Sequence, residues 1–202
     1  PKTEFVALED TGNPDWPSYQ SLIDEASGGI ESDPEVSYDD SFLLCYTSGT
    51  TGRPKGAVLS QNAILFNAAN SRHMHDLRRE DEIMVPIPLF HVGGMNILGT
   101  PALHAGATVH LMPTFGVDET FDILEKNRIS LTVLVPAQLN AMLASPRWQQ
   151  ADLSALRCIS TGSTMVPTPM LEKIHEKGIP VIQVYGSTET SPLATYLTVE
   201  TA

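Results

Sequence analysis

Residues 46–56 bring together groups that bind phosphate, in the order Tyr-Thr-Ser-Gly-Thr-Thr-Gly-Arg-Pro-Lys-Gly. Glycine lets the backbone adopt positive φ and lets backbone N–H groups approach an anion closely. Hydroxyls add neutral hydrogen-bond donors, and a lysine adds a positive charge for phosphate oxygens. We call this segment the hydroxyl loop, and we expect it to bind a polyphosphate through Thr47, Ser48, Gly49, Thr50, Thr51, Gly52 and Lys55.

The hydroxyl loop differs from the phosphate loop of P-loop nucleotidases. In that motif a Gly-Lys pair is followed by Ser or Thr, whereas Lys55 here precedes Gly56. A plain surface turn is the alternative, because Gly, Ser and Thr are common in turns. A generic turn rarely carries so many hydroxyls together with a Pro-Lys-Gly ending, so the composition favours phosphate binding.

Two later segments also carry chemically useful side chains. Residues 88–95, Pro-Leu-Phe-His-Val-Gly-Gly-Met, place His91 after an apolar run, and residues 185–190 read Tyr-Gly-Ser-Thr-Glu-Thr. Each segment also has a structural interpretation. A histidine in such a place is usually structural, Glu189 alone would be a solvated surface acid, and Tyr185 would be a half-buried aromatic residue.

Taken in this order, the three segments resemble the signatures of the adenylate-forming superfamily. That superfamily comprises acyl- and aryl-CoA synthetases, luciferases and the adenylation domains of peptide synthetases. The second and third segments resemble the acyl-CoA synthetase branch, since peptide synthetases more often show Phe-Asp-x-Ser and Tyr-Gly-Pro-Thr-Glu there. The similarity extends from about residue 40 to the end of the chain. It implies an ATP-dependent acid–thiol ligase that forms acyl-AMP and then transfers the acyl group to CoA.

The resemblance implies roles for the matched residues. Glu189 would bind Mg²⁺, with Thr47 sharing the ion, and the hydroxyl loop would hold the β- and γ-phosphates of ATP. His91, Thr188 and Glu189 are the implied catalytic residues, with Thr188 at the α-phosphate and His91 near the acid carboxylate. The remaining nucleotide-binding residues are Gly162, Ser163 and Thr164 behind the adenine, Tyr185 stacked on it, and Gly186 and Ser187.

These residue types suit the chemistry of acid activation. A carboxylate is already ionised at neutral pH, with a reference pKa of roughly 4 to 5, so no general base is needed to make it a nucleophile. The barrier comes from bringing an anion against a polyphosphate and from charge on the reacting phosphorus. Positioning, a metal ion and fixed donors should therefore dominate catalysis.

The expected acid is fatty or aryl, which suggests a role in fatty acid metabolism. Few charged residues occur in 89–103 or 131–143, the segments expected near the acyl pocket. An amino acid would need an acidic partner for its ammonium group. Two alternatives stay open: an acyl-AMP ligase that loads a carrier protein, and a nucleotide-binding module without catalysis.

From Ser41 onward, short runs rich in Val, Ile and Leu alternate with helical patterns. Strands are predicted over 42–46, 83–87, 107–112, 131–135, 156–160 and 180–184, and helices over 61–74, 94–104, 118–127, 136–144 and 168–177. This alternation predicts an α/β fold with a mainly parallel sheet flanked by helices. Ser60 should cap the first of these helices.

The three motifs follow the first, second and last predicted strands. Ligands of open parallel sheets bind beyond the carboxyl ends of the strands, so we expect the motifs to converge on one edge of the sheet. The hydroxyl loop should connect its strand directly to the helix that begins after Ser60.

Residues 1–40 are turn-rich and acidic, with one possible helix over 19–26, and are predicted to lead into an α/β subdomain over 41–202. The resemblance implies further parts outside these residues: a preceding subdomain, a ribose-binding aspartate, a hinge and a small C-terminal domain with a catalytic lysine. We therefore expect this piece alone to be inactive.

The 202 residues carry a formal net charge of −12, which disfavours nucleic acid and anionic lipid as partners. No apolar stretch is long enough to span a bilayer, and no signal peptide is visible. Cys45 and Cys158 lie in strand-like runs and are expected to be buried, reduced thiols of a cytoplasmic protein.

The histidines other than His91 carry no motif. His73 and His75 are two positions apart on a predicted helix, so they should face different directions and not share a metal. We interpret His104, His110 and His175 as structural.

Overall fold

The structure is a computed structural model that describes residues 5–9, 11–26, 28, 35–49 and 52–202. The chain divides into two units, Pro1–Val36 and Ser37–Ala202. The first unit contains the helix α1 (Tyr19–Glu25), whose N-terminus is capped by the Ser18 hydroxyl. Thr50 and Thr51 of the hydroxyl loop lie outside the described residues.

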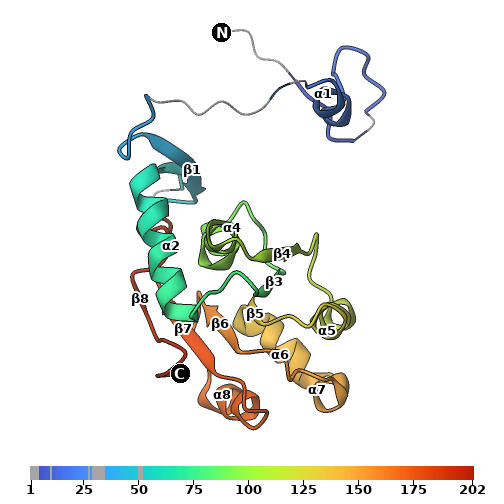
Figure 1. Ribbon diagram of the computed structural model, residues 1–202, viewed down its shortest axis with the longest axis vertical. Helices are drawn as coiled ribbons and strands as arrows, with labels where there is room; N and C mark the ends of the chain where they lie inside the picture. The colour runs from blue at the N-terminus through green and yellow to red at the C-terminus, as the bar shows by residue number, and fades with distance from the viewer. Residues whose placement is uncertain (1–4, 10, 27, 29–34, 50–51) are drawn as a thin grey trace. The chain divides into compact units, whose positions relative to one another are not determined.

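The second unit is built on a six-stranded sheet with the order β4–β3–β5–β6–β7–β8 (Figure 1). Its strands are β3 (Glu82–Val85), β4 (Thr108–Leu111), β5 (Leu131–Val133), β6 (Cys158–Gly162), β7 (Val181–Tyr185) and β8 (Thr195–Tyr196). The first five run parallel to their neighbours, and β8 pairs antiparallel with β7. The predicted α/β fold with a mainly parallel sheet is confirmed.

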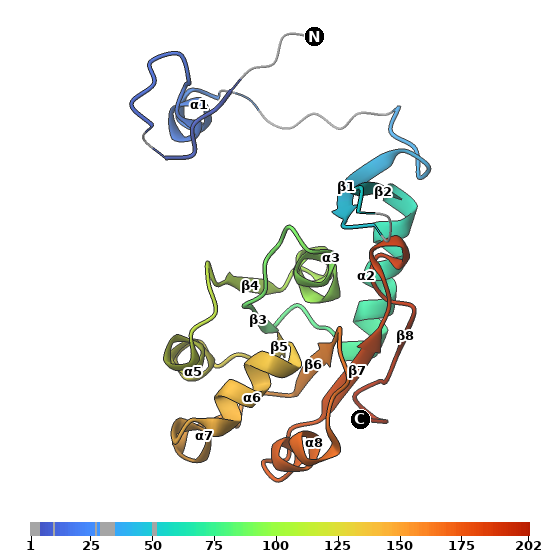
Figure 2. The same ribbon diagram turned by 180° about the vertical axis from the view of Figure 1, so that it is seen from behind.

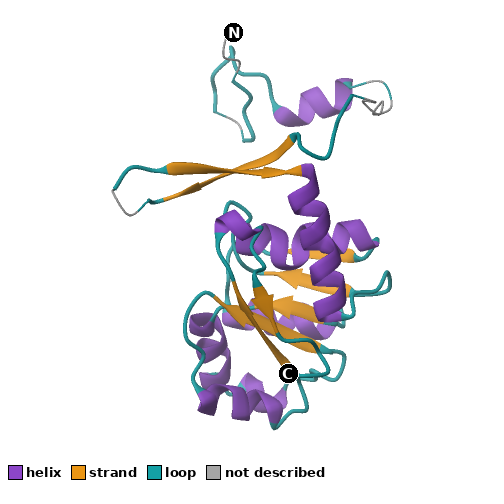
Figure 3. Ribbon diagram, turned by 90° about the vertical axis from the view of Figure 1, so that its left-hand side faces the viewer, coloured by secondary structure: helices purple, strands orange, loops and turns teal. Residues whose placement is uncertain are grey.

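Helices cover both faces of this sheet (Figures 1 and 3). One face carries α2 (Gln61–His75), the short helix α3 (Val92–Gly94), the π-helix η1 (Met95–Gly99) and α4 (Thr100–Ala105). The other face carries α5 (Val117–Lys126), α6 (Pro136–Ala144), α7 (Arg147–Gln150) and α8 (Thr168–His175). The short 3₁₀-helix η2 (Thr188–Thr190) follows β7. Within the described residues, no helix is both long and apolar enough to cross a membrane.

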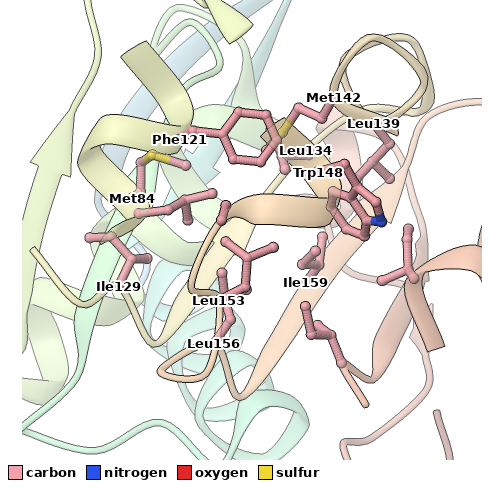
Figure 4. Close-up of a cluster of buried hydrophobic side chains, with 14 of the residues drawn as sticks. Met84, Phe121, Ile129, Leu134, Leu139, Met142, Trp148, Leu153, Leu156 and Ile159 are labelled. Carbon is pink, nitrogen blue, oxygen red and sulfur yellow. The ribbon is translucent and has the colours of Figure 1, made fainter. Parts of the chain in front are cut away.

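The strands alternate between two apolar clusters because successive side chains point to opposite faces. Ile83 and Val85 of β3 belong to the cluster under α2 and α4, whereas Met84 belongs to the opposite cluster. Figure 4 shows Met84 in that second cluster, near Phe121 of α5. Burial on both faces explains why the strands are continuous Val, Ile and Leu runs in the sequence.

The predicted helix over 94–104 is replaced by three short pieces, α3, η1 and α4. Pro101 in the first turn of α4 has no N–H, so the regular hydrogen bond to the Ile97 carbonyl cannot form there. The backbone widens into the π-helix η1 at this point. Such local widenings of helices often occur at functional sites.

The prediction that the hydroxyl loop connects a sheet strand directly to a helix was wrong. β1 (Ser41–Thr47) pairs antiparallel with β2 (Lys55–Ser60) in a separate two-stranded sheet, so the hydroxyl loop is the end of a hairpin. The second strand forms because its Leu59 can be buried with Cys45 of β1 against Val92. Ser60 then caps α2 as predicted, and its hydroxyl accepts the N–H of Ala63.

Cys45 and Cys158 are both buried free thiols, as expected. Burial raises the pKa of the Cys158 thiol to about 12. Cys158 therefore stays protonated at physiological pH and contributes to the core as a small apolar side chain.

His75 of α2 is fully buried, whereas His73 is exposed, so the two histidines do face different directions. The pKa of the His75 ring is lowered from 6.5 to about 4, and burial is the main cause. A hydrogen bond to the Ser71 carbonyl opposes this shift. The charge of Arg157 lowers the pKa further, and the charge of Asp81 raises it. The His75 ring is therefore neutral in the folded protein at physiological pH.

We expect the folded protein to lose stability as the pH falls from about 6.5 to 4, because the unfolded chain binds a proton at His75 in this range and the folded chain does not. The shift in pKa corresponds to about 3 kcal/mol over the whole window, with no further gain above pH 6.5. Thermal denaturation of the full-length protein between pH 4 and 8 measures this dependence. His75→Gln should flatten the curve in this window and His73→Gln should not; equal slopes for wild type and His75→Gln would contradict the expectation.

Candidate functional site

The three motifs line one cleft of about 620 Å³ in the second unit. This convergence is what the positions of the motifs at strand ends led us to expect. The lining residues are Thr47, Ser48, Gly49 and Lys55 from the hydroxyl loop, His91, Val92, Gly93 and Ile97 after β3, Ser163 after β6, and Val184, Tyr185, Gly186, Ser187, Thr188, Glu189, Pro192 and Leu193 from β7 onward.

Two different supports hold the walls of the cleft. The segments after β3, β6 and β7 leave the carboxyl ends of parallel strands and so emerge at one edge of the sheet. The hydroxyl loop reaches the same cleft from the β1–β2 hairpin, whose strand β2 lies beside η2 (Figure 2).

The hairpin places Thr47 directly opposite Lys55, and the Thr47 hydroxyl donates to the Lys55 carbonyl at 3.4 Å. Gly49 has a φ of +64°, and a Cβ there would overlap the Arg53 carbonyl oxygen, so the turn requires glycine. Gly52 is exposed and does not line the cleft. The described part of the hydroxyl loop thus presents two hydroxyls and one ammonium group to the cleft.

The segment after β7 forms a tight turn. The Ser187 N–H donates to the Thr190 hydroxyl at 2.9 Å, and that hydroxyl donates to the Pro192 carbonyl at 2.7 Å. Gly186 lies against this carbonyl so closely that a Cβ would overlap its oxygen. The turn therefore brings the backbone of η2 into a fixed position at the cleft.

Glu189 of η2 is exposed at the cleft and ionised at neutral pH. A hydrogen bond from its own backbone N–H lowers the pKa of the carboxyl, the Ser187 hydroxyl lowers it further, and the Lys55 ammonium also contributes. Lys55 and Glu189 are remote in the sequence, yet both line this cleft.

His91 lies between this cleft and a second cavity. Its Nδ1 accepts the Gly93 N–H at 3.0 Å and so caps α3. In the neutral ring the proton is therefore on Nε2, which this cap leaves available as a donor.

The second cavity, of about 310 Å³, is largely apolar. It lies at the carboxyl ends of the neighbouring strands β3 and β5. From β3 the chain adds β4 on one side and then β5, β6 and β7 on the other, so the strand order switches between β3 and β5. Ligands of open α/β sheets usually bind at such a switch point. Among the described residues, the lining of this cavity contains no Asp, Glu, Lys or Arg, and consists of Ile87, Pro88, Phe90, His91, Gly93, Ile97, Val133, Leu134, Val135, Gln138, Gly162 and Ser163. The Gln138 side chain is hydrogen-bonded at both ends, because its Oε1 accepts the Val135 N–H and its Nε2 donates to the Pro86 carbonyl.

The predicted adenine-backing residues divide between these spaces. Ser163 lines both, Gly162 lines the apolar cavity alone, and Thr164 lines neither. The sequence did not point to Ile97, Pro192 or Leu193, which complete the cleft, because isolated apolar residues carry no chemical signal. In the described part of the chain, no three His, Cys, Asp or Glu side chains are grouped as metal ligands.

Comparison with known proteins agrees with this geometry. The family of AMP-binding enzymes matches residues 2–202. An indoleacetate–CoA ligase of Aromatoleum aromaticum is 55% identical over 90% of this chain and 36% of that protein. A feruloyl-CoA synthase of Amycolatopsis sp. is 38% identical over 83% of this chain and 34% of that protein. The chain therefore belongs to the AMP-binding enzyme family, and its relatives are CoA ligases.

A solved structure leads to the same assignment. The inhibitor-bound N-terminal domain of FACL13 from Mycobacterium tuberculosis matches with a TM-score of 0.83 and 29% identity, over 92% of this chain and 47% of that chain. The chain spans about a third of the length of the curated relatives that it matches. The resemblance to the large domain of adenylate-forming enzymes is thus confirmed.

We expect Gly186→Ala to abolish or strongly weaken nucleotide binding, because the added methyl group would push η2 away from the Pro192 carbonyl. The measurement is calorimetric titration of the full-length protein with ATP. Ala194→Gly, an exposed change in the chain just beyond this turn, should bind ATP like the wild type. Wild-type affinity in Gly186→Ala would show that the position of η2 does not matter for the nucleotide.

Proposed function

We propose that the full-length protein containing this chain is an acid–CoA ligase. In the first reaction, a carboxylate oxygen bonds to the α-phosphorus of ATP as the bond to the β-phosphate breaks and pyrophosphate leaves. In the second, the CoA sulfur bonds to the acyl carbon, its proton is lost, and AMP leaves. The observation that supports this function is a cleft lined by phosphate-binding groups beside an apolar cavity, with His91 at both.

We assign the polyphosphate to the hydroxyl loop and η2. Lys55 with the loop hydroxyls would bind the β- and γ-phosphates, and Thr188 would donate to the α-phosphate. Tyr185 is 74% exposed beside the cleft, so its ring is free to stack on the adenine opposite the 162–164 segment. The Nε2–H of His91 would donate to the acid or the α-phosphate as charge develops.

Mg²⁺ fits this site as a partner of the phosphates. The ion usually keeps several waters and takes one or two carboxylates plus phosphate oxygens, and Glu189 offers an exposed, ionised carboxylate at the cleft. Thr47 lines the same cleft and adds a hydroxyl oxygen. When bound, Mg²⁺ would neutralise phosphate charge in a protein whose net charge of −12 opposes anions.

For the acid, the apolar cavity favours an aryl or fatty carboxylic acid over an amino acid, because the described residues that line it include no carboxylate to pair with an ammonium group. The indoleacetate–CoA ligase and the feruloyl-CoA synthase, whose names contain aromatic acids, support the aryl class. A role in fatty acid metabolism is the second possibility. We also propose a cytoplasmic location, where Cys45 and Cys158 stay reduced.

The choice of acid is tested by ATP–pyrophosphate exchange with the full-length protein and a panel of aryl acids, fatty acids and amino acids. Exchange with aryl or fatty acids followed by consumption of free CoA is the expected result. Exchange without CoA consumption would instead favour loading of a carrier protein, and exchange only with amino acids would reject the proposed acid class. ATP binding without exchange would favour a non-catalytic module.

Lys55→Ala should weaken ATP binding about tenfold or more, because a charge-assisted contact to phosphate is lost. Arg53→Ala is the matched control, since Arg53 is an exposed cation of the same loop that does not line the cleft. Calorimetric titration with ATP compares the two variants. Equal affinity in Lys55→Ala and wild type would remove the phosphate-binding role of the hydroxyl loop.

A further inference from the structure

The helix α2 carries a polar seam on its buried side. Asn67, Ser71 and His75 are spaced four residues apart, so they follow one face of the helix, and all three are buried with exposed fractions of 3%, 0% and 0%. Buried polar groups destabilise the fold unless they are hydrogen-bonded. The hydrogen-bond partners of the polar seam therefore constrain where the neighbouring elements lie.

The hydrogen bonds of His75 have a defined direction. Its Nδ1 lies 2.9 Å from the Ser71 carbonyl oxygen, which can only accept, so Nδ1 carries the proton. The opposite nitrogen, Nε2, then accepts the Ser160 hydroxyl at 2.5 Å. His75 thus connects α2 to β6, two residues before Gly162 of the apolar cavity.

The other two residues of the polar seam hold the π-helix η1. The Ser71 hydroxyl donates to the Ile97 carbonyl at 2.7 Å, the carbonyl for which Pro101 has no N–H to offer. The Asn67 amide donates to the Asn96 carbonyl at 2.6 Å. Side chains of α2 therefore hold the backbone of η1, in addition to the hydrogen bonds within η1 itself.

The groups held by the polar seam face the two cavities. Ile97 of η1 lines both the cleft and the apolar cavity, and the end of β6 continues into Gly162 and Ser163. None of the three residues of the polar seam lines either space. Their influence on a bound acid must then pass through η1 and β6.

We propose that Asn67, Ser71 and His75 are positioning residues for acid activation, which hold η1 and the end of β6 so that Ile97 and Gly162 define where the acid lies. The proposal rests on the proposed function for its catalytic readout. A change in the polar seam should move the acid relative to the nucleotide. It should therefore raise the KM for the acid more than the KM for ATP, a separation that general destabilisation does not produce.

Steady-state pyrophosphate exchange by the full-length protein tests this proposal in Ser71→Ala, with Ser71→Thr to restore the hydroxyl and Asn70→Ala as an exposed control on the same helix. Loss of the Ser71 hydroxyl, which contacts the Ile97 carbonyl oxygen and the His75 Nδ1, should raise the KM for the acid about tenfold while the KM for ATP changes less than about twofold. Ser71→Thr should recover most of the loss, and Asn70→Ala should behave like the wild type. A KM for the acid that is unchanged in Ser71→Ala, or equal increases in both KM values, would overturn the proposal.

Ser160→Ala approaches the same polar seam from β6 and serves if Ser71→Ala does not fold. If the wild type activates no acid, the proposed function is wrong, and hydrogen–deuterium exchange then decides the positioning role. Faster exchange over 92–99 in Ser71→Ala, with no change in α5 on the opposite face of the sheet and recovery in Ser71→Thr, would support it. Unchanged exchange over 92–99 would overturn it.

Discussion

The parallel alignment of β3, β5, β6 and β7 makes four chain segments leave the sheet at the same edge. Parallel strands share a direction, so their carboxyl ends cannot separate without breaking the hydrogen bonds between them. The segments that carry His91, Ser163 and Glu189 are thereby kept together although they are far apart in the sequence. The two apolar clusters on either side of the sheet stabilise this alignment, because β3, β6 and β7 each contribute side chains to both.

The charge of the protein sets a second constraint on the site. A net charge of −12 disfavours the approach of a polyphosphate, so attraction has to come from groups at short range. Under the proposed function, the hydroxyls of the cleft and the Lys55 ammonium would supply this attraction, and Glu189 would bind a divalent cation. The described residues that line the adjoining apolar cavity include no Asp, Glu, Lys or Arg, so the two spaces differ in chemical character.

The polar seam of α2 shows how a buried polar face can specify geometry. Ser71 and His75 each have a particular hydrogen-bond partner on η1 or β6, and these directional contacts favour one placement of α2 against both elements. The neutral state of His75 is part of this arrangement, since burial disfavours its protonation. The widened backbone of η1 around Pro101 supplies the carbonyl that this face requires.

Local patterns in the sequence determined the strands of the parallel sheet, the helices α2, α5, α6 and α8, the cap at Ser60 and the three motifs, because each depends on neighbouring residues. Three features depended on contacts between distant residues and were decided by the tertiary structure. β2 exists as a strand because Leu59 meets Cys45 and Val92, η1 is held from α2, and Ile97, Pro192 and Leu193 complete the cleft. The chemical groups of the site were therefore readable from residue types, whereas their supports were not, since burial and partner choice arise only when remote segments pack together.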